Sequence, residues 1–357
     1  MSRVTIARNL LAGTVVVLGA IVPAASAGAQ PSQADGTKHV AIVMASLGGG
    51  GALQWMASGG VFAASDVGGI TANVVGPSTI DGPKEVKMLQ AAAATARDGI
   101  VIENLAPPLF TQLEAKLVAK GIPIVAMDTA PMPGSNVNLY VGNDNYALGV
   151  SLAQEVIKQL PANASGTIVV NDLIKGVPTF DLRAKGITDT FAKVLPRVKA
   201  IEVSVTCQST GDCYKAFAPV VRANSHALAL LSTGTFESTA FAQLKKEQGG
   251  KYLIGGFDLN TQTLQDIKSG LVLCTVSNEH YLMGYIAMRL LAESAKTGKP
   301  LPKGWFDMPG LIVDKTLVDV VTTRQSSDAS MRAWLRPEIA RIFANTSSFM
   351  KPLSTAR

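Results

Sequence analysis

The sequence is poor in the residues that carry most catalytic and metal chemistry. It has three histidines in 357 residues, His39, His226 and His280, and they lie far apart. No zinc-ligand spacing appears, and both the G-x-S-x-G elbow and the G-x-x-x-x-G-K-[ST] phosphate loop are absent. His280 follows Glu279 and is a candidate for a place near a cleft, although a structural or exposed histidine is the favoured interpretation. We therefore expect neither an enzyme nor a cofactor or metal site.

Charged and aromatic residues are also scarce. They make up 16% and 6% of the chain, and the net charge of +6 is scattered, with no run of Lys and Arg. A nucleic-acid-binding face would need such a run, so no nucleic-acid partner is expected. The apolar content of 47% suits a packed α/β protein, and 357 residues are too many for one ordinary core, which favours two domains.

The N-terminus has the pattern of an export signal. Arg3 and Arg8 supply positive charge, Leu10 to Val22 is apolar, and Ala25-Ser26-Ala27 is a small-residue cleavage motif. The apolar stretch is short for a membrane span, although an uncleaved anchor is the alternative. We expect residues 1–27 to be a cleaved signal peptide and the mature protein to be periplasmic.

Export places the cysteines in an oxidising compartment. Cys207 and Cys213 are separated by five residues, which favours a small disulfide loop over two unpaired thiols beside a turn. Cys274 lies in an apolar run and is expected to be a buried free thiol.

Four glycines, Gly48 to Gly51, follow the first strand-like run. They are not a dinucleotide fingerprint, because G-x-G-x-x-G would need glycine where Leu53 and Gln54 stand. Two interpretations stay open: a loop that lets backbone approach a ligand, or a plain turn between strand and helix.

The stretch from Asp98 to Thr129 predicts a strand, a helix and a second strand. Such a βαβ unit requires a parallel sheet, and ligands bind beyond the carboxyl ends of parallel strands. Asn104 and Asp128 both fall there. Further strand and helix patterns alternate along residues 38–143, which predicts a doubly wound α/β lobe.

A second alternating series follows residue 144 and contains a weak echo of this unit. Ala227 to Asp258 repeats its order, so Asp258 ends a strand as Asp128 does. Two acids at strand ends of two lobes form a binding-cleft pattern. The alternative is that each Asp starts a turn or caps a helix.

The C-terminal segment, residues 323–357, has a different character. Five apolar residues at helical spacing predict one amphipathic helix: Met331, Trp334, Leu335, Ile339 and Ile342. It is expected to pack on a lobe as an extension, and binding of a partner is the alternative.

Four stretches, taken together and in order, give the chain a resemblance to a known family. They are DGIVIEN through AKGIPIVAMD, VGNDNYALG, DLRAKG at 181–186, and IGGFDLN with SGLVLCTVSNEHYLMG. Over about residues 38–322 the chain resembles the type I periplasmic substrate-binding proteins of ABC transporters, in the ribose-binding-like sugar subgroup. The resemblance implies two Rossmann-like lobes joined by a three-strand hinge, with residues 38–143 plus 279–309 in the first lobe and 144–278 plus 310–322 in the second.

The resemblance also implies a ligand site between the lobes. Its predicted members are Gln54, Trp55, Asn104, Asp128, Arg183, Thr235, Asp258 and Asn278. Asp and Asn would pair with sugar hydroxyls and Arg would bridge neighbouring oxygens. A Trp55 face suits stacking on a sugar ring, and core packing is the alternative.

The wall departs from the family pattern at three places. Thr129 stands where an Arg often follows the first Asp, residues 232–235 read Ser-Thr-Gly-Thr where an Asn-Asp pair is usual, and the first loop has glycines in place of Asn and Phe. The expected function is capture of a sugar-like molecule by hinge closure and its delivery, by a monomer, to a membrane ABC permease. The alternative is a sensory module that presents a ligand signal to a membrane receptor.

Overall fold

The computed structural model describes residues 36–48 and 51–357, and the expected signal peptide lies outside them. The strands are β1 (Lys38–Val43), β2 (Ile70–Val75), β3 (Gly99–Ile102), β4 (Ile124–Met127), β5 (Leu139–Asn143), β6 (Gly166–Asn171), β7 (Val198–Val203), β8 (Ala229–Ser232), β9 (Leu253–Phe257), β10 (Cys274–Ser277), β11 (Gly304–Met308), β12 (Leu311–Asp314) and β13 (Met350–Lys351). The helices are α1 (Ala52–Val67), α2 (Gly82–Thr95), α3 (Pro107–Ala119), α4 (Asn145–Ile157), α5 (Pro178–Val194), α6 (Thr210–Ala223), α7 (Glu237–Gln248), α8 (Thr261–Lys268), α9 (His280–Thr297), α10 (Val318–Arg324) and α11 (Asp328–Ala344), with short 3₁₀ turns at Thr346–Phe349 and Leu353–Thr355.

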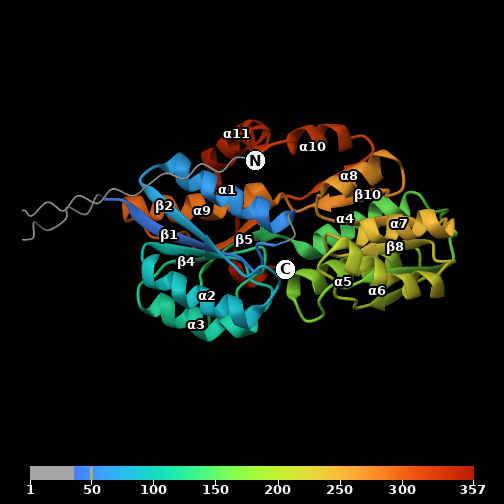
Figure 1. Ribbon diagram of the computed structural model, residues 1–357, viewed down its shortest axis with the longest axis horizontal. Coiled ribbons are helices and arrows are strands. Elements are labelled where there is room, and N and C mark those ends of the chain that lie inside the picture. The colour runs from blue at the N-terminus through green and yellow to red at the C-terminus, as the bar shows by residue number, and fades with distance from the viewer. Residues whose placement is uncertain (1–35, 49–50) are drawn as a thin grey trace, which may run out of the picture. The chain divides into compact units, whose positions relative to one another are not determined.

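Two sheets organise the chain from residue 36 onward. One has the strand order β13-β11-β5-β4-β3-β1-β2 and the other β12-β10-β9-β8-β6-β7. All pairs are parallel except β11 with β13 and β10 with β12. Helices cover both faces of each sheet, as Figure 1 shows for α1 and α9 against α2 and α3. The doubly wound α/β prediction is confirmed.

Buried apolar runs form the central strands of both sheets. β3 (GIVI), β4 (IVAM) and β8 (ALLS) are buried along their whole length, as expected for parallel strands covered on two faces. The chain crosses between the sheets after β5, after β10, after β11 and, by way of α10 and α11, after β12. The side chain of Asn143 ties the first and third crossings, because its amide donates to the carbonyls of Met308 and Pro309 at 3.0 and 3.2 Å.

Each lobe contains one helix pair that packs through glycines. A Cβ added to Gly59 on α1 or Gly284 on α9 would lie 1.9 Å from a carbonyl oxygen of the partner helix. The pair α4 and α5 repeats this arrangement, since a Cβ on Gly149 or Gly186 would lie 2.2 Å from a carbonyl oxygen across the contact. Only glycine permits so close an approach of two helix backbones.

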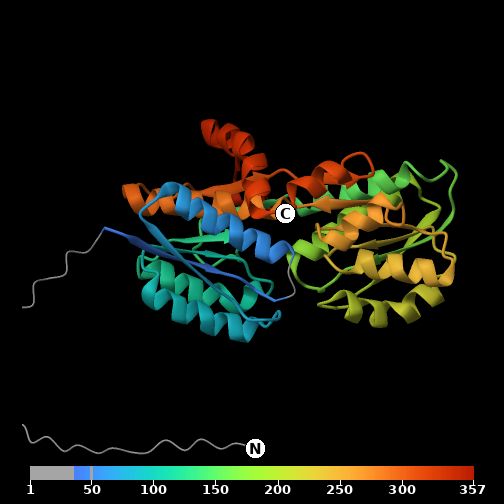
Figure 2. The same ribbon diagram turned by 45° about the horizontal axis from the view of Figure 1, so that its top comes forward.

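The C-terminal segment packs on the lobe that contains β1. Met331, Leu335, Ile339 and Ile342 of α11 are buried in the same cluster as residues of α1 and α9, and Figure 2 shows α11 above these helices. Trp334 departs from the predicted apolar face, since 53% of its surface is exposed. At 100° per residue it lies beside that face rather than on it.

Two local features differ from the sequence-based expectation. The apolar run that starts at Leu271 enters the sheet only at Cys274, because the N–H groups of Leu271 and Val272 donate to the carbonyl of Asp266 and hold the chain in a turn. The C-terminal segment was expected to be helical only, yet β13 extends the sheet beside β11. Among the described residues, no helix is both long and apolar enough to cross a membrane.

Candidate functional site

A cavity of about 160 Å³ lies where strand ends of the two sheets meet. Its walls come from both lobes, and they include four of the residues predicted from the sequence: Asp128, Arg183, Thr235 and Asp258. Asp128 follows β4 and Asp258 follows β9, so the carboxyl ends of parallel strands supply the acids.

The two acids are held in an uncommon backbone conformation. Asp128 has a φ of 62° and Asp258 a φ of 68°, the left-handed region that few non-glycine residues enter. Both side chains are buried, and the Oδ1 atom of each has no hydrogen-bond partner among the described residues. Burying an unpaired carboxylate oxygen is unfavourable, so these two atoms are natural acceptors for a ligand.

His280 completes this polar group; the sequence makes it a candidate for a place near a cleft but favours a structural or exposed histidine. Its Nε2 atom lies 4.0 Å from Oδ1 of Asp128 and 3.8 Å from Oδ1 of Asp258. It is the first residue of α9 and lines the cavity between the acids. The available signal was its position two residues after Asn278, at the start of a crossing segment.

Arg183 of α5 lies fully buried beside the cavity. Its Nε donates to the Asn145 side chain at 3.0 Å and its Nη1 to the carbonyl of Thr233 at 2.8 Å, while the guanidinium lies over the ring of Phe257. These contacts fix the guanidinium plane before any ligand arrives. Thr235 donates a short hydrogen bond of 2.5 Å to Oδ2 of Asp258.

The other four predicted site residues do not line this cavity. Asn104 and Asn278 are buried behind it, with amide atoms that have no partner among the described residues. Gln54 and Trp55 lie on α1 rather than in a loop; the Gln54 amide donates to the carbonyl of Leu47, and Trp55 packs against Tyr281. From α1 the cavity receives Ala52 and Leu53 instead.

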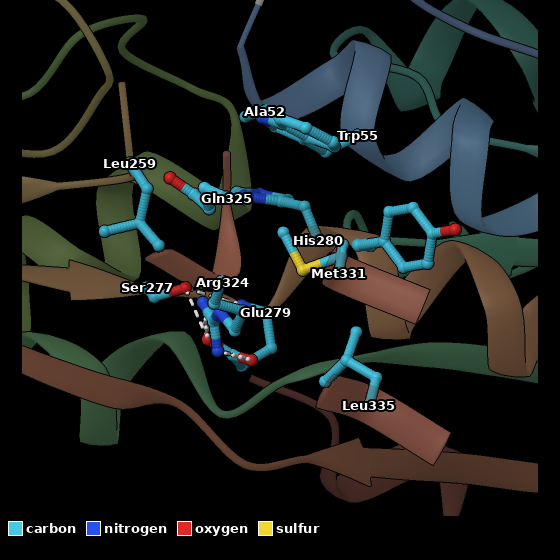
Figure 3. Close-up of a pocket in the computed structure, with 11 residues that line it drawn as sticks. Ala52, Trp55, Leu259, Ser277, Glu279, His280, Arg324, Gln325, Met331 and Leu335 are labelled. Atoms are coloured by element: carbon cyan, nitrogen blue, oxygen red, sulfur yellow. Dashed lines mark hydrogen bonds and ion pairs between the residues drawn. The ribbon is translucent and has the colours of Figure 1, made fainter. Parts of the chain in front are cut away.

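A buried ion pair between Arg324 and Glu279 lies next to His280 (Figure 3). Arg324 donates to Glu279 through both Nη1 and Nη2, at 2.8 and 3.1 Å, and Ser277 donates to the same carboxylate at 2.7 Å. Glu279 has a φ of 56°, which turns the chain sharply into α9. Arg324 therefore links the segment before α11 to the residue that precedes His280.

Three buried acids lie behind the cavity in the first lobe: Glu85, Glu103 and Glu114. Burial, and after it the neighbouring Asp128 carboxylate, raises the pKa of Glu103 to about 8. Burial also raises the pKa of Glu85 to about 9, assisted by the other two acids, and that of Glu114 to about 7. A protonated Glu103 limits the negative charge next to Asp128 at neutral pH.

A disulfide joins Cys207 and Cys213, and its loop reaches across the cavity mouth. The side chain of Gln208 in this loop accepts a hydrogen bond from the N–H of Ile80 in the other lobe, at 3.1 Å. A second contact between the lobes joins the hydroxyls of Thr129 and Thr179 at 3.1 Å. The two lobes thus touch at two places through hydrogen bonds. Cys274 is buried and free.

Two α/β lobes with a polar cavity at facing strand ends define a class of protein that closes on a small molecule. The chain matches the periplasmic binding protein domain family over residues 40–300, and it belongs to that family.

Individual relatives are distant in sequence. The D-allose-binding periplasmic protein of Escherichia coli (strain K12) is 24% identical over 237 residues, which are 63% of this chain and 75% of that protein. A solute-binding protein of an ABC transporter from Burkholderia graminis, solved with D-arabinose, aligns with a TM-score of 0.72 at 21% identity over 79% of this chain and 97% of its own. A chain of the XylFII–LytSN complex aligns with a TM-score of 0.70 at 22% identity over 78% of this chain and 98% of its own. These structures share the type I periplasmic binding protein fold with this chain.

Proposed function

We propose that this chain is an exported solute-binding protein that captures a sugar or sugar-like polyol between its lobes and delivers it to an ABC permease. The observation that carries the proposal is the pair Asp128 and Asp258, each with an unpaired Oδ1 in one cavity. Carboxylate oxygens accept hydrogen bonds from hydroxyl groups, and two acceptors from opposite lobes link ligand binding to closure.

Relatives support the same ligand class. The names of two similar proteins state that they bind D-allose or were solved with D-arabinose. The site residues proposed for this chain are Asp128, Asp258, Arg183, Thr235 and His280, with Asn104 and Asn278 as buried supports. No enzymatic role is proposed, and the site is proposed to act in a periplasmic monomer.

Thermal melting with a panel of pentoses, hexoses, inositols, amino acids and nucleosides tests the proposal. A ligand at 100 times its dissociation constant adds about 2.7 kcal/mol to the free energy of unfolding, which raises the melting temperature by several degrees. A rise with sugars or polyols alone supports the proposal. A rise with amino acids or nucleosides alone would reassign the ligand.

A sensory role is the second candidate. It is favoured by the similarity to a chain solved in complex with another protein, LytSN, and by the exposed Trp334 on α11. Trp334→Ala leaves the buried face of α11 intact, so it is expected to keep ligand binding. Loss of signalling with unchanged transport would support the sensory role, whereas unchanged signalling would exclude Trp334 as the contact.

A further inference from the structure

The cavity has an extensive apolar wall beside its polar group. Five lining residues form it, and they belong to a single hydrophobic cluster that crosses between the lobes: Ile80, Leu105, Leu173, Phe180 and Phe236. Ile80 and Leu105 come from the first lobe and the other three from the second. We refer to these five residues as the apolar wall.

The cavity also contains polar side chains, and among them Oδ1 of Asp128 and Oδ1 of Asp258 have no hydrogen-bond partner among the described residues. His280 lies within 4.0 Å of both Asp128 and Asp258, and Thr235 is hydrogen-bonded to Asp258. Beside the apolar wall, Gln208 already accepts from the N–H of Ile80. The lining side chains therefore fall into a polar group and an apolar group, which meet where the Arg183 guanidinium lies over the ring of Phe180.

This separation determines which ligand fits. A sugar with hydroxyl groups all around its ring would press one or more of them against the apolar wall. A buried hydroxyl without a partner weakens binding roughly tenfold or more. A methyl or aryl group in the same place would strengthen binding instead, by about fourfold for each buried CH₂.

We propose that the ligand is an amphipathic sugar, a deoxy sugar or an O-alkyl or O-aryl glycoside, whose apolar substituent contacts the apolar wall while its hydroxyls bind Asp128 and Asp258. This inference rests on the proposed sugar-binding function and specifies its substrate class.

Matched pairs of probes test it by isothermal titration calorimetry. The pairs are D-galactose with 6-deoxy-D-galactose, L-mannose with L-rhamnose, and D-glucose with phenyl β-D-glucoside. For at least one pair, the deoxy or aryl member is expected to bind tenfold or more tightly than its parent. Equal or tighter binding of the parent in every pair that binds would overturn the inference and leave the sugar-binding function standing. Absence of binding by all six probes would count against both.

Variants locate the preference in the structure. Leu105→Asn adds a hydrogen-bonding group to the apolar wall, so it is expected to reduce the preference for the apolar member at least fivefold. Phe236→Tyr adds one hydroxyl with a smaller risk to folding and is expected to act in the same direction. Leu109→Asn is the control, because Leu109 is 51% exposed on α3 and does not line the cavity. An unchanged preference in folded Leu105→Asn and Phe236→Tyr would overturn the role of the apolar wall.

Discussion

Asp128 and Asp258 occupy equivalent positions in the two sheets and are held by equivalent hydrogen bonds. The N–H of Asp128 donates to the carbonyl of Val141 at 3.0 Å, and that of Asp258 donates to the carbonyl of Val276 at 2.8 Å. The carbonyl of each accepts from a hydroxyl on the adjacent strand, Tyr140 in one sheet and Thr275 in the other, both at 2.8 Å. With the backbone anchored in this way, each Oδ1 stays free for a ligand.

Replacing either acid by its amide is expected to weaken sugar binding without lowering the stability of the fold. Asn tolerates the left-handed conformation and keeps the shape of Asp, so Asp128→Asn and Asp258→Asn should fold. Each removes a buried carboxylate whose Oδ1 has no partner in the described part of the chain, so the melting temperature should stay equal or rise, while sugar affinity should fall tenfold or more. Melting curves with and without sugar measure both effects. A variant that loses stability but keeps affinity would show that the acid is structural.

The pair of Glu279 and Arg324 is expected to be a large local contribution to stability. Arg324 is 5% exposed, and Arg324→Met would leave Glu279 buried without its partner. Loss of one partner of a buried pair lowers the free energy of unfolding by about 3 kcal/mol. Urea denaturation measures this loss, and the double variant with Glu279→Gln should recover part of it.

Arg341→Met is the matched control for this pair. Arg341 pairs with Glu338 on the surface of α11, where the Arg341 side chain is exposed and that of Glu338 is partly exposed. An exposed pair of this kind contributes about 0.5 kcal/mol. A loss of similar size in Arg324→Met would argue against the importance of the buried pair.

The acids Glu85, Glu103 and Glu114 predict that stability falls as pH rises. Burial raises their folded-state pKa values to about 9, 8 and 7, above an ordinary value of 4.5. The folded state therefore binds more protons than the unfolded state. The three acids make their full contribution to the free energy of unfolding only below about pH 4.5, and this contribution is lost progressively as the pH rises to 7–9.

Thermal melts between pH 5 and pH 9 check this dependence. Glu85→Gln should flatten the decline and should stabilise more at pH 9 than at pH 5. Glu247→Gln is the control. Glu247 is exposed and the Tyr214 hydroxyl lowers its pKa, so its titration should not change stability between pH 5 and pH 9. Equal slopes for Glu85→Gln and the unaltered protein would contradict the assignment.

The glycine contact between α4 and α5 is expected to reject even one methyl group. A Cβ at Gly186 would lie 2.2 Å from the carbonyl oxygen of Tyr146 and 2.9 Å from the N of Val150. Gly186→Ala should lower the free energy of unfolding by about 2–3 kcal/mol. It should also weaken sugar binding, because Arg183 lies one turn away on α5. Gly211→Ala, where a Cβ meets open space in α6, should stabilise slightly. Urea denaturation of the two variants checks the contrast.

The sequence was most informative where one physical rule acts alone. Buried strands and the Asp at the end of β4 and β9 followed from apolar runs that stop at a polar residue. The three Glu residues behind Asp128 could not be found in this way, because acids on helices are normally solvated. His280 was underrated for a similar reason, since its partners Asp128 and Asp258 come from strands far away in the sequence.

The apolar wall was also beyond sequence reasoning. Leu105 and Phe180 have the pattern of ordinary core residues, and they do belong to a hydrophobic cluster. Their second role depends on the two lobes approaching each other. For Trp55 the sequence leaves sugar stacking and core packing both open, and in the structure its ring packs beside Tyr281.

The two glycine-packed helix pairs have opposite consequences for the order in which the lobes can form during synthesis. α4 and α5 are neighbours in the sequence, so their contact can form as soon as the chain has passed Val194. α1 must wait for α9, more than 200 residues later, and for α11 after it. Closing so long a loop is slow. The parallel part of the second lobe, from β6 to β10, can therefore form first, with its edge strand β12 added later, while the N-terminal half of the first lobe, apolar β1 included, stays incomplete until α9 and α11 have been made.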